Sequence, residues 1–100
     1  MSKKYDILIF LADGFEEIEA VTTIDILRRA GVEVIVAGVG HKTVKGAYGL
    51  EVMTERDIKE ISAENIDMLI LPGGGGGVDN LCKSTHVASL LQEMKKSKYL

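Results

Sequence analysis

Two stretches of the sequence hold residues whose types and spacing suit chemistry. Five consecutive glycines occupy positions 73–77, shortly after an apolar run at 68–71. Three carboxylates, Glu16, Glu17 and Glu19, follow the first apolar run of the chain. Glycine has no Cβ, so the N–H groups of such a run can approach a ligand closely, and a positioned carboxyl group can exchange a proton.

Three kinds of site and one purely structural role are alternatives for the glycine run. A phosphate-binding P-loop needs a Lys followed by Ser or Thr, but Val78, Asp79 and Asn80 follow Gly77. A dinucleotide fingerprint follows the first strand and opens a long helix, whereas this run follows a late strand and leads into a short segment. An oxyanion hole, in which a backbone N–H faces a developing negative charge, is the third possibility. The structural alternative is a flexible turn that needs only glycine's conformational freedom.

Glu19 differs from the two neighbouring carboxylates. Carboxylates at a helix N-terminus are stabilised by the helix dipole, which explains most such clusters. Glu19, however, begins a helical row whose other members are mostly apolar. These members are Thr23, Ile26 and Ala30. We therefore expect Glu19 to be partly buried, with Glu16 and Glu17 more exposed. A partly buried carboxyl group beside another anion keeps its proton to higher pH and can donate a hydrogen bond.

The elements that must position these residues follow from the apolar pattern. Uninterrupted apolar runs predict strands buried on both faces, as in a parallel sheet. Such runs lie at residues 7–11, within an expected strand at 5–12, and at 68–71, and the mostly apolar segment at 32–37 is the remaining expected strand. Apolar residues at three- and four-residue intervals predict a helix over 16–30, with Gly31 at the position of a helix C′ glycine. The opening therefore forms a βαβ unit with an expected right-handed crossover.

The remaining elements are shorter. Ser84 or Thr85 can cap a last helix. The apolar row of this helix consists of Val87, Leu90, Leu91 and Met94. Residues 41–54 predict an irregular hairpin or flap, and residues 56–61 predict one or two helical turns. Loops that follow parallel strands meet at the carboxyl edge of a sheet, so we expect Glu19 to lie near the glycine turn.

Composition excludes several classes of function. The chain has 100 residues and a formal net charge of −3, without a basic stripe, which argues against nucleic acid and anionic membranes as partners. A small metabolite or another protein remains. The first apolar run is too short for a secretory signal. The single Cys82 excludes an internal disulfide and a zinc cluster, and fits a reducing, cytoplasmic setting.

The remaining reactive side chains are weak candidates. We interpret Cys82 as an ordinary buried or half-buried thiol and not as a nucleophile. His41 lies in a glycine-flanked loop and His86 in the first turn of the last helix, so both are expected to be structural or exposed. These three residues share no metal-ligand spacing, and we expect neither a metal nor a cofactor.

Three segments together resemble the DJ-1/PfpI superfamily, most closely its DJ-1 and ThiJ/YajL branch. They are LADGFEEIEAVTTIDILRRAG at 11–31, VEVIVAG at 32–38 and DMLILPGGGGGVDNL at 67–81. The resemblance covers essentially the whole chain. It implies a flavodoxin-like, doubly wound α/β sandwich of three layers and a homodimer. Members are described as glyoxalases or protein deglycases, chaperones and sensors of oxidative stress.

The resemblance also implies roles for two residues. In the family, the Glu that matches Glu19 hydrogen-bonds a reactive cysteine, and the backbone N–H that matches Gly74 contributes to the oxyanion site. The family's nucleophilic Cys lies just after the strand that Tyr99 would begin, and its His partner lies further on. Family members are nearly twice this length, so residues 1–100 look like the amino-terminal part of a single domain.

These implications give one expected function and two alternatives. With a cysteine from beyond residue 100, the domain would be a glyoxalase or deglycase acting on methylglyoxal-type carbonyls or their adducts. The alternatives are a non-enzymatic redox sensor or chaperone, and a free-standing small binding domain. We also expect the strand that ends at Leu71 to lie beside the first strand, with its outer edge paired by a strand that begins at Tyr99. Residues 1–100 would then be ordered only with the remainder of the domain or another copy.

Overall fold

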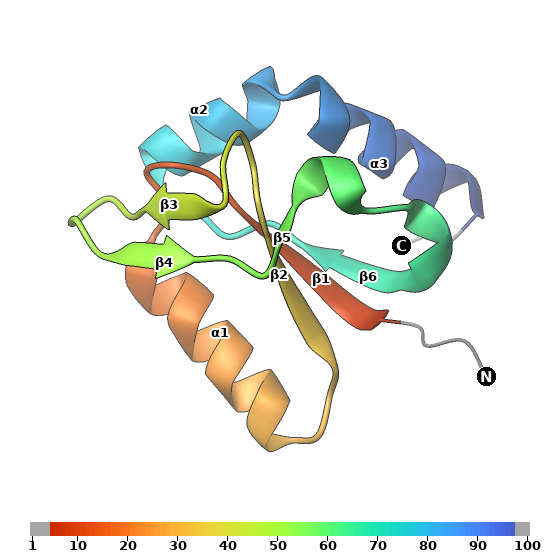
Figure 1. Cartoon of the computed structure of the whole chain (residues 1–100), viewed down its shortest axis with the longest axis horizontal. Helices are drawn as coiled ribbons and strands as arrows, with labels where there is room; N and C mark the ends of the chain where they lie inside the picture. Colours follow the sequence, from red (N-terminus) through yellow and green to blue (C-terminus); the bar gives the residue numbers. More distant parts are fainter. Residues whose placement is uncertain (1–4, 98–100) are drawn as a thin grey trace.

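A four-stranded parallel sheet forms the centre of the computed structural model, which describes residues 5–97 (Figure 1). The strands are β1 (Tyr5–Leu11), β2 (Val34–Gly38), β5 (Arg56–Asp57) and β6 (Ile66–Ile70), in the order β5-β2-β1-β6. β1 pairs with both β2 and β6, so it is central. From β1 the chain adds β2 and then β5 on one side of the sheet, and it then crosses to add β6 on the other side of β1. This places the switch point of the sheet between β1 and β6, where α/β folds build their sites.

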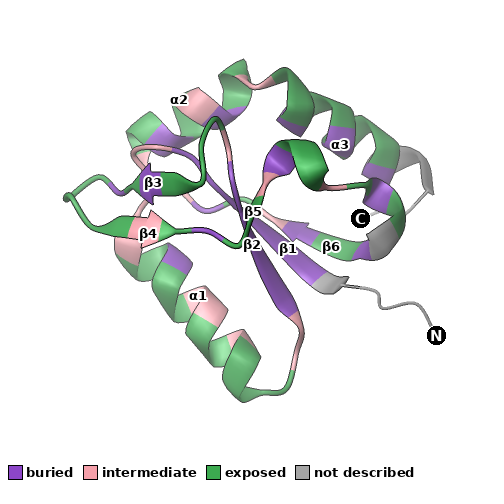
Figure 2. Cartoon of the chain, viewed as in Figure 1, coloured by how far each residue is buried: buried purple, intermediate pink, exposed green. Residues whose placement is uncertain are grey.

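Helices cover both faces of the sheet and make three layers. α1 (Glu17–Arg29) lies on one face, and α2 (Gly75–Lys83) and α3 (Thr85–Ser97) lie on the other (Figure 1). Alternate side chains of β1 supply the two cores, because successive strand residues point to opposite faces. Leu8 and Phe10 pack with the α2 and α3 side, whereas Ile7 and Ile9 pack with the α1 side. The expected burial of the central strands on both faces is confirmed, as Figure 2 shows for β1 and β2.

The ends of the helices follow local capping rules. Gly31 has φ +87°, the conformation expected of a C′ glycine after α1. Ser84 caps α3, because its Oγ accepts the Val87 N–H at 3.2 Å. In the apolar row of α3, Val87, Leu90 and Met94 are buried, but Leu91 is 40% exposed. The predicted helix is confirmed, and only the inward direction of Leu91 was wrong.

The hairpin predicted over residues 41–54 is confirmed. β3 (Thr43–Lys45) pairs antiparallel with β4 (Glu51–Met53) as a separate two-stranded sheet. The helical turns predicted over 56–61 are reduced to the 3₁₀ turn η1 (Ile58–Glu60), because residues 56–57 extend the main sheet as β5. A second 3₁₀ turn, η2 (Ala63–Asn65), leads into β6.

The segment after the glycine turn, expected only as a short segment, is a helix that already begins within the glycine run. α2 has nine residues and includes three glycines, Gly75, Gly76 and Gly77. Glycine disfavours helix, so propensity conceals this element. The close packing of Gly76 and Gly77 on the loop after β1 is visible only in three dimensions.

β6 lies at the edge of the main sheet. Within residues 5–97 no strand pairs with its outer edge. Met68 of β6 is 43% exposed and the following Leu71 is 41% exposed. The strand expected from Tyr99 lies outside the described residues. In that same part of the chain, no helix is both long and apolar enough to cross a membrane.

Candidate functional site

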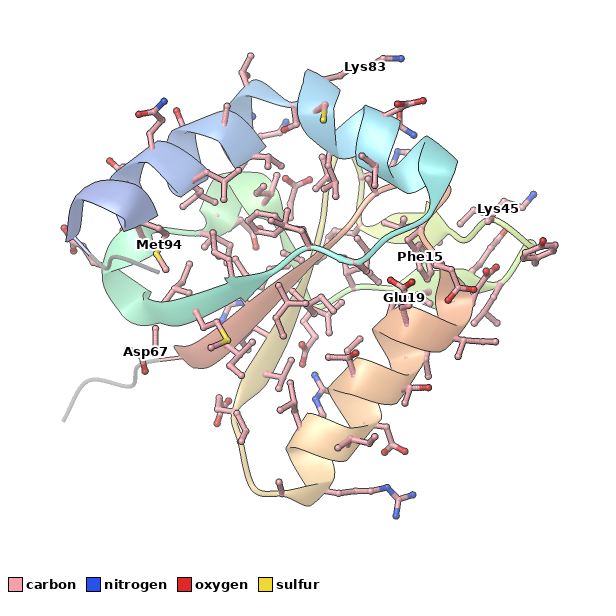
Figure 3. All side chains as sticks on the ribbon, turned by 180° about the vertical axis from the view of Figure 1, so that it is seen from behind. Phe15, Glu19, Lys45, Asp67, Lys83 and Met94 are labelled. Carbon is pink, nitrogen blue, oxygen red and sulfur yellow. The ribbon has the colours of Figure 1, made fainter. Side chains whose placement is uncertain are left out.

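Glu19 and the glycine turn meet at the carboxyl edge of the sheet. Glu19 lies in the first turn of α1, which follows β1, and the glycine turn follows β6, which pairs with β1. The Gly73 N–H donates to Glu19 Oε1 at 2.8 Å. Figure 3 shows Glu19 and Phe15 at the end of α1 nearest to the start of α2. The predicted proximity of Glu19 to the glycine turn is therefore confirmed.

Gly74 takes a conformation that only glycine adopts readily. Its φ is +106°, and it is the N-cap residue of α2 without a side-chain cap. A Cβ on Gly74 would lie 2.6 Å from the Gly14 carbonyl oxygen and 2.8 Å from the Glu16 nitrogen. Within residues 5–97 the Gly74 N–H has no hydrogen-bond acceptor. A free backbone donor therefore lies one peptide away from the N–H that binds Glu19.

The other glycines of the run differ in what their positions require. Cβ atoms placed on Gly14 and Gly77 would overlap the facing loop, at 2.7 Å from the Gly77 nitrogen and 2.9 Å from Phe15 Cα respectively. A Cβ on Gly75 would meet nothing within 4 Å. Gly77 therefore has a structural role other than the flexible turn that the sequence left open: it lies in α2, where close packing on the loop after β1 leaves no space for a Cβ.

The expected burial of the carboxylates was wrong. Glu19 is exposed, whereas Glu16 and Glu17 are half-buried. The row that Glu19 heads does not face the core, because Ile26 is 58% exposed and Ala30 is also exposed. The face of α1 that contacts the sheet carries Ala20, Ile24 and Leu27 instead. Glu19 thus borders an open groove of about 310 Å³ beside the end of β6, which is also lined by Ile18 and Leu71.

Glu17 has a role that sequence reasoning missed. Its Oε2 accepts the N–H groups of Tyr48 at 2.7 Å and Leu50 at 3.3 Å, so it holds the tip of the hairpin. Burial acts to raise the pKa of Glu17, but the N–H groups of Tyr48, Glu17 itself and Leu50 outweigh it and leave the pKa lowered. Among the described residues, Glu17 Oε1 is a buried oxygen without a partner. In the sequence, only the glycines at 46 and 49 indicate that this turn is approached closely by another side chain.

Asp13 joins three further segments to the end of β1. Its Oδ1 accepts the Lys45 N–H at 3.0 Å, its Oδ2 lies 2.9 Å from His41 Nε2, and its carbonyl accepts Asn80 Nδ2 at 2.8 Å. The Lys45 N–H is the main cause of its lowered pKa, which His41 lowers further against the effect of burial. His41 therefore braces a loop, in agreement with the structural or exposed role expected for it.

Cys82 lies apart from the Glu19 site. It is an exposed free thiol on α2, which corrects the expectation of burial. His86 is exposed at the start of α3. Across residues 5–97 there is no group of three or more side chains arranged to hold a metal ion.

Comparison with known proteins gives a consistent set of relatives. The DJ-1/PfpI family profile matches residues 5–100. Protein dj-1beta of Drosophila melanogaster is 35% identical over 88% of this chain and 48% of its own length. Glutathione-independent glyoxalase DJR-1.2 of Caenorhabditis elegans is 30% identical over 96% of this chain and 51% of its own. The crystal structure of the VC2308 protein has a TM-score of 0.90 and 39% identity, covering 100% of this chain and 50% of that one.

The structural match agrees with the fold described above, and all three relatives are longer than this chain. The chain spans about half of each of these three relatives. The family match extends over nearly the entire sequence. The chain therefore belongs to the DJ-1/PfpI family.

Proposed function

We propose that residues 1–100 supply the Glu19 and Gly74 part of a cysteine-dependent glyoxalase or protein deglycase site. The observation that carries this proposal is the Glu19 carboxylate bound to the Gly73 N–H, one peptide from the free Gly74 N–H. A base beside a preorganised backbone donor is the arrangement that addition to a carbonyl requires. The glyoxalase name of DJR-1.2, and the deglycase name of a Thermococcus kodakarensis relative 34% identical over 68 residues, support the same reaction class.

The proposed chemistry begins with a cysteine from beyond residue 100. Its sulfur forms a bond to the aldehyde carbon of methylglyoxal, or of a related adduct, and the carbonyl π electrons move to oxygen. The Gly74 N–H binds that oxyanion, and the Glu19 carboxylate takes the thiol proton and returns it later. For methylglyoxal, the hydrogen on the aldehyde carbon then moves as a proton to the neighbouring carbonyl carbon, which gives a thioester of a hydroxy acid. Water cleaves the C–S bond and releases the hydroxy acid and the thiol, so the net reaction adds one water and needs no external oxidant or reductant. No cofactor has a part in these steps.

The groove beside β6 supports a carboxy-terminal remainder as the source of the cysteine. Ile18 is 74% exposed there, and Met68 and Leu71 add further exposed apolar surface. A strand paired with the free edge of β6 would cover this surface and bring its carboxyl end next to Gly74. Relatives about twice as long as this chain are consistent with such a completing segment.

A homodimer is also proposed. Exposed apolar side chains lie on α1 and on the hairpin, at Val21, Tyr48 and Met53. A groove of about 380 Å³ between these elements is lined by Val21, Val52 and Met53. Apolar surface of this kind on neighbouring elements is typical of an interface. The scarcity of cysteine supports a cytoplasmic setting, and the net charge of −3 supports neither nucleic acid nor membrane as a partner.

A redox sensor or chaperone is the second candidate, and the exposure of Glu19 favours it. An accessible site would admit an oxidant, and the same carboxyl group could hydrogen-bond an oxidised cysteine. A free-standing binding domain is the third, and it requires residues 1–100 to be folded and monodisperse alone.

Turnover of methylglyoxal separates the first two candidates. Residues 1–100 would be joined to the part of glyoxalase DJR-1.2 that lies outside its matched 51%, which is proposed to supply the cysteine, and the product is called the joined chain. We expect hydroxy acid formation that is lost when the introduced cysteine is replaced by serine. A folded joined chain that retains its reactive cysteine but gives no product would reject the enzyme and favour the sensor.

A further inference from the structure

Glu16, Glu19 and Gly73 form a closed ring of hydrogen bonds. The Glu16 N–H donates to the Gly73 carbonyl at 3.0 Å, and the Gly73 N–H donates to Glu19 Oε1 at 2.8 Å. The Glu19 N–H closes the ring by donating to Glu16 Oε1 at 2.8 Å. Both the backbone and the side chain of Glu19 are therefore tied, directly or through Glu16, to the glycine turn.

The ring departs from an ordinary capping box in one respect. In a capping box the N3 carboxylate reaches back to the N-cap N–H. Here Glu16 is the N-cap and Glu19 is at N3, but Gly73 lies between the Glu19 carboxylate and the Glu16 N–H, which would bond to each other in a capping box. Gly73 gives its N–H to the N3 side chain and its carbonyl to the N-cap N–H. The cap of α1 is thus completed by Gly73, the residue that precedes Gly74.

We propose that Glu16 is a positioning residue for the Glu19 carboxylate, an inference that rests on the proposed function. The Glu16 side chain fixes the first turn of α1, and its backbone N–H fixes the glycine turn. Together they set the position of the Glu19 carboxyl group relative to the Gly74 N–H. Glu16 does not touch a substrate in this assignment and acts only through Glu19 and Gly73.

The close contact between Glu16 and Gly74 supports this role. A Cβ on Gly74 would lie 2.8 Å from the Glu16 nitrogen, so the two backbones pack without space between them. A shift of the α1 N-terminus would therefore move the turn that carries the Gly74 N–H. Misplacement by about 1 Å can cost on the order of 100-fold in rate.

The variant Glu16→Gly provides the test, because glycine is itself a favourable N-cap residue and its substitution costs only a few tenths of a kcal/mol. It removes the side-chain acceptor and leaves the helix able to form. Glu16→Gln is the rescue variant, since its amide oxygen can still accept the Glu19 N–H. Ser84→Ala is the matched control, because it removes a helix cap of the same type from α3, away from Glu19.

The first measurement is the Gly73 amide proton of the joined chain, followed by NMR as the Glu19 carboxyl group titrates. We expect Glu16→Gly to abolish the titration of this signal, and Glu16→Gln and Ser84→Ala to keep it. If Glu16→Gly leaves the titration as in the parent chain, the positioning role is overturned. This readout requires no turnover, so it remains decisive if the joined chain proves to be a sensor.

The second measurement is the pH profile of methylglyoxal turnover. We expect Glu16→Gly to lower kcat/KM by about 10- to 100-fold and to shift the profile. We expect Ser84→Ala to lower thermal stability and leave the profile in place. If the Gly73 amide signal of Glu16→Gly titrates as in the parent chain and the pH profile of turnover is unchanged, Glu16 is only a helix cap and has no role at the site.

Discussion

Gly77 lies so close to Phe15 that no other residue fits at its position. A Cβ on Gly77 would be 2.9 Å from Phe15 Cα and 3.0 Å from its nitrogen, and both are backbone atoms that cannot rotate away. The contact joins the loop after β1 to the first turn of α2. It therefore sets the spacing between the start of α1, which carries Glu19, and the turn that carries Gly74.

The first prediction compares two glycines of the same run. Gly77→Ala should destabilise the joined chain by about 1–3 kcal/mol, because the added methyl group overpacks the contact with Phe15. Gly75→Ala is the matched control: its Cβ meets nothing within 4 Å, and alanine favours helix by up to about 1 kcal/mol over glycine. Urea unfolding measures both, and equal effects of the two substitutions would contradict the packing argument.

The second prediction concerns the carboxylate of Glu19. In the joined chain, Glu19→Gln should lower kcat/KM for methylglyoxal by about 100- to 10,000-fold, because the amide cannot accept the thiol proton. The pKa of the introduced cysteine, measured from its alkylation rate against pH, should change as well. Glu60→Gln, at an exposed position on η1, is the control and should leave both values unchanged. An unchanged thiol titration in Glu19→Gln would remove the assignment.

The proximity of Glu19 to the glycine turn could be predicted because it depends on topology. Buried apolar runs identified the parallel strands, and loops after such strands meet at one edge of the sheet. The burial of Glu19 could not be predicted in the same way. Helical periodicity placed it on a row with Ile26, but apolar residues also occur on exposed faces, and Ile26 is one of them.

α2 and the role of Glu17 were missed for a different reason. Both depend on contacts between residues far apart in the sequence. Glu17 binds N–H groups 31 and 33 residues away, and no local pattern signals such a bond. The glycines of α2 oppose helix locally, and for Gly76 and Gly77 the reason is the loop that packs on them. Sequence patterns report local preference, and tertiary contacts override it at these two places.

The third prediction is a pH dependence of the hairpin. The pKa values of Glu17 and Asp13 are both lowered, and both carboxylates accept N–H groups of the hairpin. A lowered folded pKa contributes stability above the unfolded pKa, and this contribution is lost as the pH falls through the folded pKa. Stability should therefore decline below about pH 4.5, the ordinary carboxyl value of Glu17.

The variant Glu17→Gln isolates this effect. It should be less stable than the parent joined chain at pH 7, and the difference should shrink as the pH falls, since the parent carboxylate becomes protonated. Unfolding by urea at several pH values measures the difference. Hydrogen exchange of the Tyr48 amide should be faster in the variant. A stability difference that stays constant down to pH 3 would show that charge is not the cause.

The fourth prediction concerns Cys82. It is exposed on α2, so reagents can reach it, but among the described residues no side chain is hydrogen-bonded to its thiol to make it a catalytic group. Its alkylation by iodoacetamide at neutral pH should proceed at the rate of an ordinary thiol in an unstructured peptide. Cys82→Ser should leave methylglyoxal turnover unchanged in the joined chain. Alkylation much faster than that of the peptide would revive Cys82 as a nucleophile.

The last prediction concerns the free edge of β6. Within the described residues this edge has no partner strand, and Met68 and Leu71 expose apolar surface beside it. Such an edge is a template for pairing with another chain, and a domain of this size has a stability margin of only a few kcal/mol. We therefore expect residues 1–100 alone to aggregate and to lack glyoxalase activity, and the joined chain to be soluble.

A pair of lysine substitutions tests whether the edge itself causes the aggregation. Met68→Lys places a charge on the edge strand, and natural edge strands use lysine to prevent pairing. Val78→Lys places the same charge on α2, at an apolar residue that is 44% exposed compared with 43% for Met68. Light scattering of residues 1–100 should fall with Met68→Lys and stay high with Val78→Lys. Sedimentation and thermal melting of residues 1–100 without either substitution give the opposing outcome. If this chain is a monomer that unfolds cooperatively, β6 needs no partner strand, and the free-standing binding domain becomes the better description.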